Sequence, residues 1–154
     1  MKSKKKPQKK PLAPKAIARR WFEHVWNRKN PVVLTELMDP SAVGITEGGP
    51  IRGPDEFRTH VFEPLSKAFP DFRVSIDGMV SEGNDVMLRW SFKATHGGPF
   101  GPVPASGRRV ACSGMTWLKC RKGKIVGGSD SYNLHGLIAY LSSGAECATV
   151  RSTK

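Results

Sequence analysis

A chain of 154 residues, 38% of them apolar, is long enough for one domain with one core. No apolar run approaches the roughly 18 residues that a membrane helix needs, so the sequence excludes the transmembrane class and predicts a soluble protein. The net charge is +12, yet nine of the 25 basic residues lie in positions 1–20, where there is no acidic residue. The remainder carries 16 basic and 13 acidic groups, so the basicity belongs to a tail.

Residues 1–13 are rich in Lys and Pro and have little to bury, which predicts a disordered basic tail. The tail is either a solubilising extension, a weak contact to nucleic acid or another anionic surface, or a targeting signal. No hydrophobic segment of the signal-peptide type follows it. Outside the tail there is no basic stripe interleaved with aromatic residues, so nucleic acid is not expected as the main partner.

Helical patterns dominate the first half of the domain. The first helix is predicted to begin after Pro14, where apolar residues recur at every fourth position. Asn30-Pro31 reads as an N-cap followed by proline at the first helical position. A short strand at 41–46 and a turn at 47–50 precede a third helix, which opens at Gly53-Pro54 and should bend at Pro64.

The second half changes to a period of two, which is typical of strands. Strands are predicted at 74–77, 86–95, 110–121 and 124–129, with turns at 82–85 and 122–123 and a closing helix at 134–141. Helices first and an antiparallel sheet afterwards indicate an α+β fold. Three helices packed into a curved sheet would leave a cone with an open end. The last residues, 142–154, are expected to form a loose end.

The three cysteines do not suggest disulfides. Cys112 and Cys120 fall on one predicted strand, about 26 Å apart at the usual rise per residue, so they cannot bond to each other. With Cys147 the number is odd, and no C-x-x-C pair occurs. We expect reduced, buried thiols and a cytoplasmic location.

A loop rich in glycine and proline follows His96, with four glycines and three prolines before Arg108. A phosphate loop would need G-x-x-x-x-G-K-[ST] before a helix, but Gly107 is followed by a strand. A metal site would need clustered ligands, whereas the histidines are widely separated: His24, His60, His96 and His135. We therefore predict no metal and interpret the loop as a pocket lip, whose glycines let backbone approach a ligand closely.

Asp130 is the only acid between Asp85 and Glu146 and follows an apolar strand. Inside an apolar cone its pKa would be raised, and it could exchange a proton with a carbon acid. The alternative is that Asp130 caps the following helix. His96 would polarise a substrate carbonyl, or it is a rim histidine bonded to the loop backbone.

An apolar cavity would need large apolar side chains around Asp130. The predicted substrate-binding residues are Trp90, Phe100, Met115, Trp117, Tyr132 and His135. The alternatives are plain core packing for the Trp and Met residues, a packing or helix-start role for Tyr132, and a surface position for His135.

Several motifs occur in a fixed order along residues 14–141: Ala68-Phe-Pro-Asp71, Glu82-Gly-Asn-Asp85-Val86, Thr95-His96-Gly97, Pro99-Phe-Gly-Pro-Val-Pro104 and Gly123-Lys-Ile-Val126 leading to Asp130. In this order and spacing they resemble the SnoaL-like polyketide cyclases, also called ester cyclases, of the nuclear-transport-factor-2-like superfamily. The resemblance defines a cone domain at 14–141.

The resemblance implies an α+β cone, a homodimer or homotetramer, and ring closure of an apolar carbonyl substrate by intramolecular aldol condensation without metal or cofactor. It places the acid/base role on Asp130 and an assisting role on His96. Where the family carries a bulky residue shortly before the aspartate, this chain has Gly127-Gly128-Ser129. That departure keeps open the alternative of a non-catalytic small-molecule-binding module on the same fold.

Overall fold

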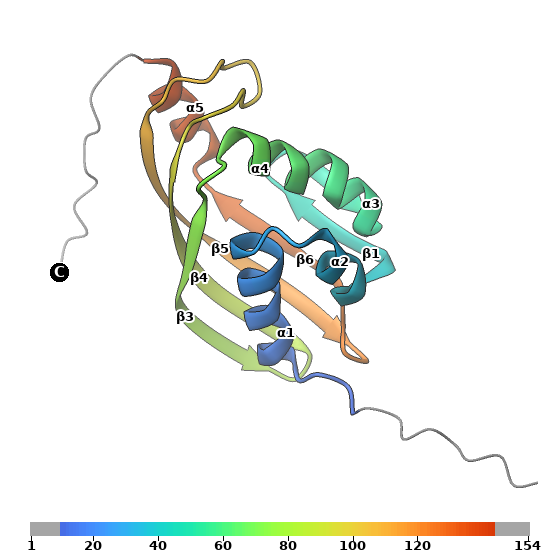
Figure 1. Ribbon diagram of the computed structural model, residues 1–154. Coiled ribbons are helices and arrows are strands. Elements are labelled where there is room, and N and C mark those ends of the chain that lie inside the picture. Colours follow the sequence, from blue (N-terminus) through green and yellow to red (C-terminus); the bar gives the residue numbers. More distant parts are fainter. Residues whose placement is uncertain (1–9, 144–154) are drawn as a thin grey trace, which may run out of the picture.

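The computed structural model describes residues 10–143, and its centre is one curved six-stranded sheet (Figure 1). The strand order is β2-β1-β6-β5-β4-β3. The strands are β1 (Met38–Thr46), β2 (Gly49–Arg52), β3 (Arg73–Glu82), β4 (Asp85–Thr95), β5 (Arg109–Arg121) and β6 (Lys124–Tyr132). The α+β prediction is confirmed, whereas the basic tail up to residue 9 and the end from 144 lie outside the described residues.

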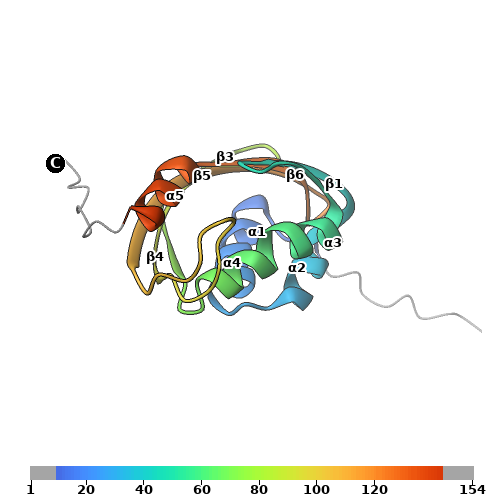
Figure 2. The same ribbon diagram turned by 90° about the horizontal axis from the view of Figure 1, so that it is seen from above.

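The helices of the first half of the chain lie in the hollow of the sheet, whereas the last one lies at its rim, as Figure 2 shows from above. The helices are α1 (Pro14–Arg20) continued by the wider turns of η1 (Trp21–Asn27), α2 (Pro31–Leu37), the continuous run α3 (Gly53–Phe57), η2 (Arg58–Phe62) and α4 (Glu63–Ala68), and α5 (Leu134–Ser142). No helix within residues 10–143 is both long and apolar enough to cross a membrane.

The predicted helix starts are confirmed. Pro14 opens α1, and the Asn30 side chain caps α2 by accepting hydrogen bonds from the backbone N–H groups of Val32 and Val33. In the third helix the wide turns of η2 directly precede Glu63-Pro64. Because proline has no N–H to donate, the regular helical hydrogen bonds cannot continue through it.

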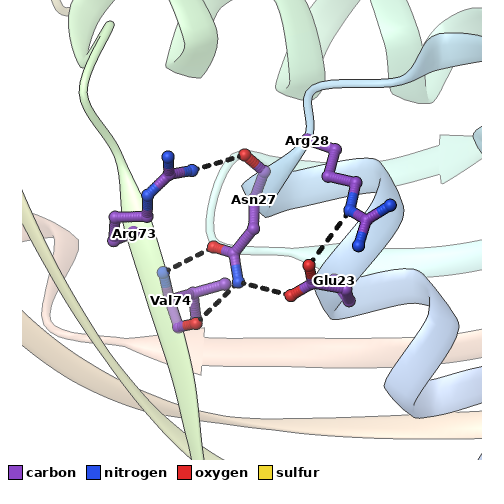
Figure 3. A network of polar contacts seen from close by, with 5 residues as sticks. All are labelled: Glu23, Asn27, Arg28, Arg73 and Val74. Atoms are coloured by element: carbon purple, nitrogen blue, oxygen red, sulfur yellow. Dashed lines mark hydrogen bonds and ion pairs between the residues drawn. The ribbon is translucent and has the colours of Figure 1, made fainter.

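A polar network ties the end of η1 to the first residues of β3 (Figure 3). The Asn27 side chain accepts from the Val74 N–H at 2.9 Å and donates to the Val74 carbonyl at 3.0 Å. Arg73 donates to the Asn27 carbonyl at 2.7 Å, and Glu23 accepts from both Asn27 and Arg28. The network fixes the helix against the sheet edge, which holds Phe22 and Trp26 of η1 in the hydrophobic core.

The sheet differs from the predicted strands in several ways. β1, β3 and β6 are longer than predicted, and β2 is not among the predicted strands. The turn predicted at 47–50 is shorter, because β2 already begins at Gly49 and pairs with β1. β1 also pairs with β6 in parallel, so the sheet is antiparallel everywhere except at this junction.

One irregularity sets the register between β5 and β6. Cys120 pairs with Ile125, but Lys119 pairs with Gly127, which leaves Val126 as an extra residue on β6. Beyond this bulge Thr116 lies opposite Asp130. β6 runs on to Tyr132, so Asp130 lies within a strand.

The alternative that Asp130 caps the closing helix is wrong. Asn133 is the residue before α5, and its side chain accepts a hydrogen bond from the Gly136 N–H at 2.8 Å. Asp130 lies three positions too early to reach the first turn of α5 as a cap. Its carboxylate is therefore available for another role.

Candidate functional site

A cavity of about 360 Å³ lies between the helices and the concave face of the sheet. Aromatic side chains from both layers supply much of its wall: Phe22, Trp26, Phe72, Trp90, Phe92 and Phe100. Its polar and titratable side chains are Thr46, Glu47, His60, Thr116, Asp130 and Tyr132. Such a wall accepts an apolar ligand and offers it a small number of polar contacts.

Asp130 ends a chain of hydrogen bonds that crosses three adjacent strands. The Trp90 indole N–H donates to Oγ1 of Thr116 at 2.9 Å, and the Thr116 hydroxyl donates to Oδ1 of Asp130 at 2.5 Å. Trp90 lies on β4, Thr116 on β5 and Asp130 on β6. Thr116 is only 3% exposed, so this hydroxyl is shielded from water.

The surroundings of Asp130 favour its neutral form. Burial raises the pKa of its carboxyl, the Thr116 hydrogen bond partly opposes that rise, and the nearby Glu47 carboxylate raises the pKa further. Glu47 follows β1 and is held by the Tyr132 backbone N–H, which donates to its Oε1 at 2.9 Å. A carboxyl with a raised pKa holds a proton more readily than an exposed one, which suits it to taking up and returning a proton.

Tyr132 adds a neutral hydrogen-bond donor to the same wall. Burial is the main cause that raises the pKa of the Tyr132 phenol to about 12, and the negative charge of Asp130 is the second. The phenol therefore stays protonated at physiological pH, and its O–H can donate to a ligand oxygen.

A second, smaller cavity of about 50 Å³ shares Thr46, Thr116 and Asp130 with the first. Gly44 on β1 and Gly128 on β6 face each other in the sheet and both line this cavity. The glycines noted before Asp130 in the sequence thus leave space beside the acid, where a family member with a bulky residue would have a side chain.

The cavity includes some of the predicted site residues. Asp130, Trp90, Phe100 and Tyr132 all line it. Phe100 and the adjacent Gly101 come from the loop predicted as a pocket lip, so this part of the loop does border the cavity. The most buried glycine of the loop serves a different contact: a Cβ at Gly98 would lie 2.3 Å from the Lys67 carbonyl oxygen, at the end of α4.

Three other predicted lining residues are absent from the wall of this cavity. Met115 and Trp117 alternate with Thr116 on β5, and their side chains are exposed on the opposite face of the sheet, where Trp117 donates to Asp85 at 2.8 Å. Trp117 borders only the smaller cavity. His135 is exposed on α5. Met115 and Trp117 lie away from Asp130 because the bulge at Val126 puts Asp130 on the same face of the sheet as Thr116.

His96 is fully buried but does not line the cavity. Its Nδ1 accepts from the Ser106 N–H at 3.3 Å and contacts the Ser106 hydroxyl at 2.9 Å. Its ring packs on Phe69, which in turn contacts Phe100 of the cavity wall. Burial lowers the pKa of His96, which favours the neutral ring. This geometry matches the loop-backbone alternative and supports the wall from behind.

Sequence reasoning missed Glu47, His60 and Thr116. Glu47 lies in the predicted turn at 47–50 and His60 in the predicted third helix, yet both line the cavity. Thr116 lies on the predicted strand at 110–121, without a feature that distinguishes it from its neighbours. The signal that could have found it is its place opposite Asp130, which requires the position of the bulge.

Solved structures with the same fold span nearly the whole chain. A candidate SnoaL-like polyketide cyclase from Jannaschia sp. CCS1 is 20% identical, with a TM-score of 0.80 over 94% of this chain and 100% of that one. AclR from Streptomyces galilaeus, a candidate hydroxylase, is 27% identical over 89% of this chain and 85% of that one, with a TM-score of 0.75. IdmH from Streptomyces antibioticus, a candidate polyketide cyclase, is 24% identical over 84% of this chain and 99% of that one, with a TM-score of 0.73.

No curated protein matches the chain significantly. The family model for the SnoaL-like polyketide cyclases, however, matches residues 16–141. This range contains both the cavity and the hydrogen-bonded chain that ends at Asp130. In sequence and in fold alike, the chain belongs to the SnoaL-like polyketide cyclase family.

Proposed function

We propose that the protein is a small enzyme that transfers protons on an apolar carbonyl compound, with Asp130 as acid and base. One observation carries the proposal: a carboxyl with a raised pKa faces an aromatic cavity and is held by a buried hydroxyl. The cavity volume of about 360 Å³ lies in the range of small-molecule sites.

The reaction can be written with Asp130 as the only proton carrier. Ionised Asp130 takes the proton from the carbon next to a carbonyl, which leaves an enolate. The enolate carbon attacks a second carbonyl of the same molecule, a carbon–carbon bond forms, and the new alkoxide takes the proton back from Asp130. The step is redox-neutral and needs no co-reactant. The Tyr132 phenol can donate to the enolate oxygen.

His96 has no part in this proposal, because its ring packs on Phe69 outside the residues that line the cavity and its Nδ1 bonds to Ser106. Its role is to hold the loop stem, where the His96 N–H donates to the Arg108 carbonyl and the Gly107 N–H donates to the His96 carbonyl. A neutral, buried imidazole suits that structural role.

The proton-transfer half of the reaction can be tested without knowing the natural substrate. The probe is an aryl alkyl ketone in D₂O, and proton NMR measures deuterium uptake at its α-carbon. We expect exchange above the buffer rate with the native protein. We expect at least about a 100-fold loss in Asp130→Asn, because general acid–base groups contribute 10²–10⁴-fold.

Ligand binding is measured in parallel by quenching of tryptophan fluorescence. Equal binding by the native protein and Asp130→Asn, with no exchange by either, would contradict the catalytic proposal and favour a binding module. Full exchange by Asp130→Asn would remove Asp130 from its role.

A further inference from the structure

We propose that Trp90 and Thr116 are positioning residues that lock the Thr116 hydroxyl onto Oδ1 of Asp130 and thereby leave Oδ2 as the oxygen that exchanges protons. The inference rests on the proposed role of Asp130. It concerns which atom of the carboxyl acts and what holds it in place, and the family match does not address either question.

The direction of the two hydrogen bonds follows from the chemistry of the groups. An indole N–H can only donate, so Thr116 must accept from Trp90 through Oγ1. An ionised carboxylate can only accept, so Thr116 must donate its single proton to Oδ1 of Asp130. Both bonds of the Thr116 hydroxyl are then fixed by their partners.

The same direction holds when Asp130 is protonated. A proton on Oδ1 would have to be donated to Oγ1 of Thr116. The Thr116 hydroxyl proton would then need another acceptor in a buried place, and a buried unsatisfied donor is costly. A proton on Oδ2 keeps the bond from Thr116 intact. The exchangeable proton therefore resides on Oδ2 in the neutral state.

The sheet is built to allow this contact. Gly114 is paired with Trp90, and a Cβ at position 114 would lie 2.5 Å from Cζ2 and 2.7 Å from Cη2 of the indole. The indole thus lies across Gly114 and reaches Thr116, two residues further along β5. Glycine is otherwise unfavourable within a strand, and it commonly marks a close approach of another group.

The other titratable groups that line this cavity are Glu47 from the β1–β2 turn, His60 from η2 and Tyr132 from β6. None of them takes part in the hydrogen bonds from Trp90 to Asp130. The Trp90 ring also contacts the Tyr132 ring, with centroids 6.0 Å apart, so substitutions at Thr116 are the ones that change the contact to Asp130 without altering the packing of these neighbours.

The test is an infrared titration of the ligand-free protein. The carbonyl stretch of protonated Asp130 is identified by subtracting the spectrum of Asp130→Asn. In Thr116→Val, which removes the hydroxyl, we expect the protonation midpoint to rise by about one to two pH units, from the loss of a hydrogen bond to a charged group. Thr116→Ser keeps the hydroxyl and should restore the native midpoint.

The matched control is Thr95→Val. The Thr95 hydroxyl donates to Oδ2 of Asp71 at 2.7 Å, a threonine–aspartate pair distant in sequence from Asp130 and outside the residues of the cavity wall. This variant should leave the Asp130 midpoint unchanged. Trp90→Phe removes the indole N–H and should give a smaller upward shift than Thr116→Val, together with a broader carbonyl band from a hydroxyl that is free to rotate.

An unchanged midpoint in Thr116→Val, or failure of Thr116→Ser to restore it, would reduce Thr116 to a packing residue. If Thr116→Val does not fold, Trp90→Phe provides the test. A native protonation midpoint and a native carbonyl band width of Asp130 in Trp90→Phe would overturn the inference. Because no substrate is used, a positive titration combined with a failed deuterium-exchange assay would refute the proposed reaction while preserving the assignment of the proton to Oδ2.

Discussion

The two faces of β5 place neighbouring residues in different environments. Thr116 is 3% exposed and holds Asp130 on the concave face, whereas Met115 and Trp117 on either side of it are 52% and 38% exposed on the outer face. The large apolar residues thus lie outside, and the small polar one lies at the cavity. In this sheet the position relative to the β6 bulge, and not residue size, decides which side chain meets the cavity.

The largest expected difference between the two faces of β5 concerns two aspartates that each accept a hydrogen bond from this strand. Asp130 accepts from Thr116 on the concave face, and Asp85 accepts from Trp117 on the outer face. We expect Asp130→Asn to lose about 100-fold or more in deuterium exchange, and Asp85→Asn to keep the native rate. Equal losses in both variants would show that exchange does not depend on the concave face.

A substitution to alanine on either face should separate the two faces in stability. Gly114→Ala would bring a Cβ to 2.6 Å from the Ser131 carbonyl oxygen as well as into the Trp90 ring, so we expect a loss of about 1–3 kcal/mol in the free energy of unfolding. The neighbouring Ser113 is exposed, and Ser113→Ala should stay within about 0.5 kcal/mol. Urea unfolding measures both, and a tolerated Gly114→Ala would show that the indole can move aside.

Ligand binding gives a smaller but direct contrast. Phe100 lines the cavity, whereas Met115 lies on the outer face. Phe100→Ala removes apolar contact area, so affinity for an aryl ketone should fall about fivefold to tenfold. Met115→Ala should leave the affinity unchanged in a fluorescence titration. Weaker binding in Met115→Ala would place the ligand on the outer face instead.

The mildest expected effect concerns His96 and acid stability. Burial lowers the pKa of His96 in the folded state below its ordinary value of 6.5. As the pH falls below 6.5, the unfolded chain takes up a proton at this residue before the folded one does, so the free energy of unfolding decreases. In His96→Gln this contribution should vanish between pH 7 and 5, as measured by melting temperature against pH. An unchanged pH profile would mean that His96 titrates alike in both states.

The sequence predicted most of the fold because each signal is local. The proline helix starts, the Asn30 cap and the turn at 122–123 depend on a few adjacent residues, and all are present in the structure. The motifs likewise predicted the family, whose model matches residues 16–141.

The residues around Asp130 could not be predicted in the same way. A regular hairpin turning at 122–123 would pair Asp130 with Met115 and bring it to the face of Met115 and Trp117. The one extra residue at the bulge moves Asp130 to Thr116 instead. The depth of His96 depends on long-range packing against Phe69, and no local pattern encodes it.

The paired glycines beside Asp130 have unequal freedom to change. At Gly128, with φ at +150°, a Cβ would lie 2.1 Å from the Trp117 carbonyl oxygen, so this position must stay glycine. At Gly44 a Cβ would meet only the Gly128 oxygen at an ordinary 3.7 Å. Position 44 therefore has room for an alanine methyl group, which would narrow the space next to the acid without straining the backbone, whereas position 128 cannot change in this way.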